Sequence, residues 1–82
     1  MNQALKNQLI KAVQLIASDD WNGAHQIVQM YSDSTSRWIH AVLHKIEGDE
    51  SNSRYWYARC NARFEDYADI KQELEAIRDF LI

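Results

Sequence analysis

Two of the three histidines in this chain stand one helical turn apart, and a glutamate follows them. His40 and His44 are four residues apart, and Glu47 comes three residues later, a spacing that places the three side chains along one face of a helix. Zinc and similar ions accept imidazoles and carboxylates, with water completing the shell, and a metal-bound hydroxide would then be available for hydrolysis. Because no glutamate directly follows His40, the segment does not match the metalloprotease motif H-E-x-x-H.

The remaining histidine, His25, joins this pair if the chain forms a helical hairpin. The polar run at residues 32–36 predicts a turn, because short acceptor side chains compete with helix and then cap the next one. Antiparallel helices on either side of that turn place His25 opposite residue 42, between His40 and His44. We therefore expect the three imidazoles to lie within one side-chain length of each other.

Two interpretations of the histidines follow from their surroundings. The histidine stripe borders the apolar face of Ile39, Leu43 and Ile46, so rings covered by Trp21 and Trp38 would be neutral hydrogen-bonding groups in the core. This structural interpretation is the favoured one. Rings open to solvent would instead form a metal or ligand site.

Length, charge and cysteine content limit the class of protein. Residues 1–82 make one domain, and the net charge of −3 disfavours general binding to nucleic acid. No apolar run approaches the roughly 20 residues that a membrane span needs. The single cysteine, Cys60, cannot form an internal disulfide and reads as a small buried side chain without a chemical role. These features predict a cytoplasmic protein.

Apolar residues recur at intervals of three and four, which predicts an all-α fold. The expected helices are five, at about 5–16, 21–31, 36–47, 50–62 and 67–81. Gly48 falls where a helix end commonly turns left-handed. The residues expected to form the core are Trp21, Leu43, Ile46, Trp56, Tyr57 and Leu74.

A weak internal repeat links the second and fourth expected helices. Asp20 and Asp49 lie 29 residues apart, and each is followed four positions later by a small residue, Ala24 or Ser53. A capping acid and a small residue at a helix contact predict two stacked αα-hairpins, with the last helix closing the chain. This logic is similar to that of tetratricopeptide and Sel1-like repeats.

A longer pattern spans both halves of the chain. Residues 20–25 read DWNGAH and residues 38–60 read WIHAVLHKIEGDESNSRYWYARC. Together they resemble a bacterial and fungal family of uncharacterised small helical proteins, with the pattern W-x-x-A-H and then W-x-H-A-x-L-H-R-x-E-G-D-x-x-N-A-x-Y-W-Y. The resemblance covers about half the chain and departs at Lys45 and Ser53. It implies a helical fold and no particular activity.

Three function classes remain, and an interaction or scaffold module without catalysis or cofactor leads them. Stacked hairpins form a concave surface between their first helices, where Arg37, His40, His44, Glu47 and Arg54 would bind an acidic peptide of an unknown partner.

The other two classes depend on different residues. The first alternative is a metal or ligand site, with zinc as its ion, built on His25, His40, His44 and Glu47. Interleaved arginines and aromatics at residues 54–63 make nucleic acid a less favoured partner. The heptad-like C-terminal helix predicts a homodimer.

Overall fold

In the computed structural model, which describes residues 1–82, the chain forms five α-helices and no strands. This confirms the all-α fold class. No helix combines the length and the apolar character that crossing a membrane requires. The elements are α1 (Gln3–Ala17), α2 (Trp21–Val28), α3 (Ser34–Ile46), α4 (Glu50–Tyr57), the 3₁₀ turn η1 (Phe64–Asp66) and α5 (Ile70–Leu81).

Each α-helix begins at a short polar side chain that accepts a hydrogen bond from a backbone N–H of the first turn. This contact satisfies one of the amides that a helix start leaves without a partner. Asp20 and Asp49 begin the two helices that the repeat predicted, and Asp33 begins α3 within the predicted polar turn. The five capping residues are Asn2, Asp20, Asp33, Asp49 and Asp69.

The turns from α1 to α2 and from α3 to α4 have the same construction, 29 residues apart. Asp19 (φ 64°) and Gly48 (φ 82°) are left-handed, and the next residue in each turn, Asp20 or Asp49, donates its N–H to the carbonyl five residues earlier at 2.8 and 3.0 Å. This is the Schellman pattern of a helix C-terminus. The two hairpin turns therefore share one backbone geometry.

Replacing Asp19 with glycine should stabilise the protein by about 0.5 to 1 kcal/mol. A side chain at a left-handed position costs roughly 1 to 2 kcal/mol, and the extra unfolded-state freedom of glycine offsets part of the gain. The reverse change, Gly48→Asp, should destabilise by a similar amount, because its Cβ would meet no atom and only the backbone angle matters. Urea denaturation measures the free energy of unfolding of both variants. A lower value for Asp19→Gly than for the parent protein would contradict the prediction.

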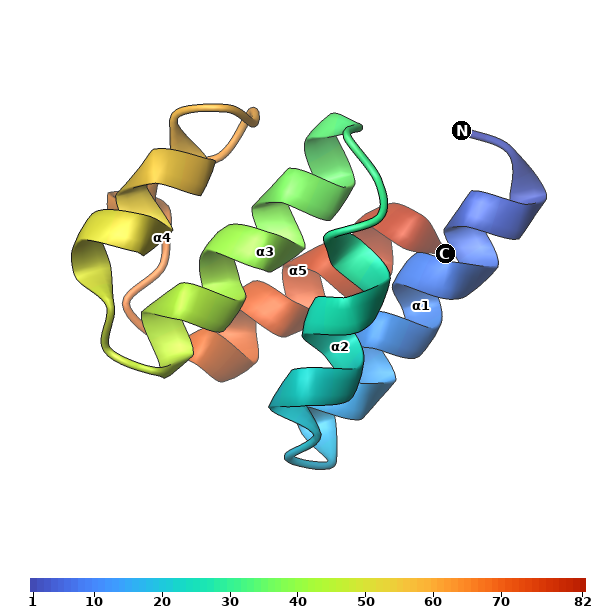
Figure 1. Cartoon of the computed structure of the whole chain (residues 1–82), viewed down its shortest axis with the longest axis horizontal. Helices are drawn as coiled ribbons and strands as arrows, with labels where there is room; N and C mark the ends of the chain where they lie inside the picture. Colours follow the sequence, from blue (N-terminus) through green and yellow to red (C-terminus); the bar gives the residue numbers. More distant parts are fainter.

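The first four helices form two hairpins, and the fifth crosses them (Figure 1). Helix α1 packs against α2, α3 packs against α4, and α5 lies across α1 and α3. The first helices of the two hairpins, α1 and α3, are thus both in contact with α5. Helix α3 contacts all four other α-helices, which makes it the centre of the fold.

The central position of α3 explains where the core prediction fails. Six consecutive residues of α3, 39–44, are buried, because neighbours cover the helix on all sides and burial no longer follows one stripe. Leu43 and Tyr57 are buried as predicted, whereas Ile46, in the last turn of α3, is 42% exposed. The prediction for Ile46 was therefore wrong. Trp21, Trp56 and Leu74 are partly buried and pack against the core.

The chain between α4 and α5 is more irregular than the sequence predicted. Helix α4 ends at Tyr57 and α5 begins at Ile70, so both are shorter than expected. The Lys45 ammonium donates hydrogen bonds to the backbone carbonyls of Phe64 (3.0 Å) and Tyr67 (3.1 Å). These two hydrogen bonds from a side chain of α3 hold the segment in a non-helical conformation.

The same lysine belongs to a buried polar network that joins α3, α4 and α5. The Glu73 side chain is fully buried, and its carboxylate accepts hydrogen bonds from Lys45 (2.8 Å), Tyr57 (2.6 Å) and the Trp38 indole (2.9 Å). Burial and the Glu73 carboxylate raise the pKa of the Tyr57 phenol above its ordinary value. The phenol therefore stays protonated and donates. No buried side-chain polar atom is left without a partner, as a stable buried network requires.

Candidate metal centre

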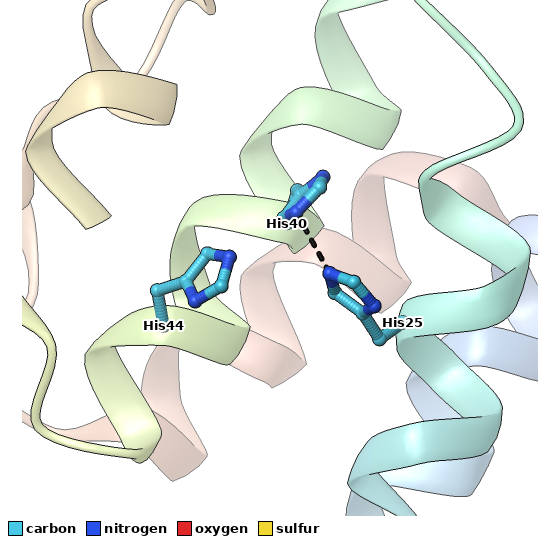
Figure 2. A group of neighbouring side chains, drawn as sticks. All are labelled: His25, His40 and His44. Carbon is cyan, nitrogen blue, oxygen red and sulfur yellow. Dashed lines mark hydrogen bonds between the residues drawn. The ribbon is translucent and has the colours of Figure 1, made fainter. Parts of the chain in front are cut away.

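The three histidines converge at the contact between α2 and α3, as the hairpin register predicted. His40 and His44 are one turn apart on α3, and His25 faces them from α2 (Figure 2). The Nε2 atoms of His25 and His40 are 3.1 Å apart, and one donates a hydrogen bond to the other. One potential metal-binding nitrogen from each ring lies within 4.8 Å of the other two.

Glu47 sets the orientation of one ring. The Nδ1–H of His44 donates to a Glu47 carboxylate oxygen at 2.6 Å, one turn further along the chain. Figure 2 shows the other nitrogen of the His44 ring, Nε2, turned toward His25 and His40. A carboxylate that holds the far nitrogen of a histidine fixes the tautomer and increases the basicity of the ligating nitrogen. The arrangement is the one expected behind a metal-bound histidine.

Two tryptophans cover the outer faces of the imidazoles. Trp21 stacks on His25 at 4.8 Å between ring centroids, and Trp56 stacks on His40 at 4.0 Å, both with interplanar angles of 14°. The Trp21 indole is itself held by a 2.7 Å hydrogen bond from Nε1 to the Leu43 carbonyl. The expected cover by Trp38 is wrong, because that indole bonds instead to the buried carboxylate of the polar network.

Burial and mutual repulsion keep the pair of bonded histidines uncharged. Desolvation, together with smaller effects of the neighbouring His25 and His44 rings, lowers the pKa of His40 to about 4. Desolvation and His44 also lower the pKa of His25 below its ordinary value, against a smaller opposing effect of Glu47. Both rings are thus neutral at pH 7, which is the form that ligates metals.

The spacing of the nitrogens matches what a small ion requires. Two nitrogens bound to one tetrahedral zinc at about 2.0 to 2.1 Å lie roughly 3.3 Å from each other. The observed 3.1 Å between the His25 and His40 nitrogens differs from that by a few tenths of an ångström. One nitrogen of His44 lies within 4.8 Å of both. The cluster is therefore close to a coordination geometry.

The two arginines predicted to bind a ligand have other partners. Arg54 pairs with Glu50 (2.8 Å) and Glu65 (2.6 Å), and Arg37 donates to the backbone carbonyl of Arg59 at 3.4 Å. Of the candidate ligand-binding set, the structure therefore brings together His40, His44 and Glu47 and directs Arg37 and Arg54 elsewhere.

Sequence reasoning also missed two parts of this region. The cover of His40 by Trp56 depends on how α4 crosses α3, for which spacing along the chain gives no signal. The burial of Glu73 could have been predicted, because this residue falls between Ile70 and Ile77 within the apolar stripe of α5.

No known protein family, curated protein or solved structure matches this chain. The resemblance to small uncharacterised helical proteins and the likeness to tetratricopeptide repeats therefore stay predictions.

Proposed function

We propose that this protein binds one divalent transition-metal ion through His25, His40 and His44. The observation that carries the proposal is the convergence of three imidazoles from two helices within 4.8 Å, with a carboxylate 2.6 Å from the far nitrogen of one of them. A purely structural cluster would be expected to pair each ring with a separate acceptor. Here two ring nitrogens face each other and a third is directed at them.

The donor set favours the ions that bind imidazole nitrogen. Three neutral imidazoles suit zinc, copper(II), nickel(II) and cobalt(II), whereas magnesium and calcium prefer oxygen donors. The only cysteine, Cys60, bonds to its own loop at the carbonyls of Tyr57 and Ala62. Zinc is the first ion to test, because it accepts a tetrahedral nitrogen set without a redox partner.

The position of the site suggests what the ion does for the fold. His25 belongs to the first hairpin, and His40 and His44 belong to the second. A shared ion would therefore connect the two hairpins where α2 meets α3, and its binding energy would add to folding stability. Binding of an acidic peptide, homodimer formation and a cytoplasmic location remain separate predictions.

Zinc binding is tested by calorimetric titration of the untagged protein. We expect one ion per chain, and we expect His25→Ala to weaken binding more than about 100-fold, since loss of an outer-shell partner alone costs 10- to 100-fold. His25 is the least buried of the three rings, so its removal disturbs the fold least.

Three variants serve as matched controls for this titration. Gln26→Ala changes the exposed neighbour of His25 on the same helix, and Cys60→Ser removes the thiol. Asp49→Asn tests the second group of potential ligands, formed by the buried His44 and the exposed Glu47 and Asp49, while keeping a helix-capping side chain. All three should bind zinc as the parent does. No binding by the parent, or equal binding by His25→Ala, would contradict the proposal.

A further inference from the structure

We infer that an ion held by His25, His40 and His44 keeps one exchangeable coordination position, which takes water or a small monodentate anion. This inference rests on the proposed metal binding and adds the chemical class of the site's external ligand. A closed site supplies four protein donors, whereas a site with three donors leaves a position to solvent or substrate.

The structure supplies three donors and no fourth. A fourth protein ligand would be a donor atom of another histidine, cysteine, aspartate or glutamate that lies within 4.8 Å of all three imidazole nitrogens. The cluster contains no such atom. Glu47 is the nearest carboxylate, but it is hydrogen-bonded to Nδ1 of His44. Since Nδ1 and Nε2 lie on opposite sides of an imidazole, this carboxylate cannot reach an ion at Nε2 while it holds the ring.

Exposure and charge indicate where and by what the free position is filled. His40 and His44 are only 6% and 7% exposed, whereas His25 is half-buried, so solvent meets the cluster beside His25. Three neutral imidazoles bring no charge, so only the outer Glu47 carboxylate offsets the double charge of the ion, and the remaining positive charge favours an anion as the fourth ligand. Water bound there would have a lowered pKa, near 7 for a three-histidine zinc site.

The surroundings limit the size of that ligand. Five cavities of the molecule have volumes of about 210 to 600 Å³, and none of the three histidines lines any of these five. None of these cavities would therefore enclose a bulky substrate at the ion. Small anions such as azide, thiocyanate or hydroxide need none, because one coordinate bond supplies most of their binding energy.

Cobalt(II) makes the coordination position visible, because its absorption bands change when a ligand is exchanged. The untagged parent protein is loaded with one equivalent of cobalt(II) and titrated with azide and then with thiocyanate. We expect each anion to shift the bands in a saturable manner that fits one anion per ion. Cys60→Ser should respond as the parent does.

The outcomes separate this inference from the metal proposal. Cobalt that stays bound with bands insensitive to both anions would show that a protein group fills the fourth position, and it would overturn the inference alone. Glu47→Gln identifies that group as Glu47 if anion sensitivity then appears. Cobalt-dependent dimerisation on gel filtration without an anion response would assign the position to a second chain and would also overturn it. Failure to bind cobalt or zinc would overturn both proposals.

Discussion

Glu73→Ala should lower the free energy of unfolding by about 3 to 5 kcal/mol, which is the cost of breaking a buried ion pair from one side. A domain of this length is stable by only about 4 to 12 kcal/mol. At the lower end of this range the variant would be unfolded at 25 °C, and at the upper end it would lose a quarter or more of its stability. The expected result follows from the fully buried carboxylate and its three hydrogen-bond donors.

The size of the effect comes from the groups that lose their acceptor. Without Glu73, the Lys45 ammonium, with its side chain 10% exposed, keeps two backbone carbonyls but no counter-charge. The Trp38 indole and the Tyr57 hydroxyl lose their acceptor in the same space. An unsatisfied buried donor costs roughly 1 to 3 kcal/mol, and a buried charge costs more. These penalties act on the contacts that fix α5 to α3 and α4.

Chemical denaturation followed by circular dichroism measures this change. Glu75→Ala is the matched control, because it makes the same substitution two positions along α5 at an exposed residue, where an effect within about 0.5 kcal/mol is expected. Lys45→Met combined with Glu73→Met should cost less than Glu73→Ala, since it removes the pair together. If Glu73→Ala unfolds at the same denaturant concentration as the parent, the network does not hold α5.

The buried pair of Glu73 and Lys45 shows how far sequence patterns predict this fold. The recurrence of apolar residues every three or four positions, together with the capping residues, predicts five helices. Asp20, Asp33 and Asp49 begin α2, α3 and α4. An acid inside an apolar stripe signals a buried partner, but its identity depends on how α5 crosses α3. That crossing is set by packing between residues far apart in the chain.

The histidine cluster was more predictable than the core, for a physical reason. A single turn fixes the register of α2 against α3, so the approach of His25 to His40 and His44 follows from local geometry. Burial of Ile46 depended instead on which helices surround α3. Because α3 is enclosed by four neighbours, one apolar face was the wrong description of it, and Ile46, at its C-terminal end, is exposed.

Zinc should raise the stability of the metal-free protein by a large amount for its size. At a free zinc concentration 100 times the dissociation constant, binding to the folded state alone adds about 2.7 kcal/mol. For a domain of this length, that corresponds to a rise of roughly 10 to 20 °C in the melting temperature. A bound ion would replace the hydrogen bond between His25 and His40 with coordinate bonds from three rings that only the folded chain holds together. The protein is first treated with EDTA and then melted with and without zinc.

Variants decide whether this rise comes from the three-histidine centre. His25→Ala should abolish most of the rise, whereas Gln26→Ala and Cys60→Ser should keep it in full. Glu47→Gln should keep part of it, because the amide oxygen still accepts the Nδ1–H of His44 but no longer carries the charge that strengthens the ligand, which reduces affinity 10- to 100-fold. At the same zinc concentration, affinity lower by those factors removes about 1.3 to 2.3 of the 2.7 kcal/mol. A melting temperature that zinc leaves unchanged would mean that the three imidazoles are neutral packing groups, held together by Trp21, Trp56 and the bond between His25 and His40.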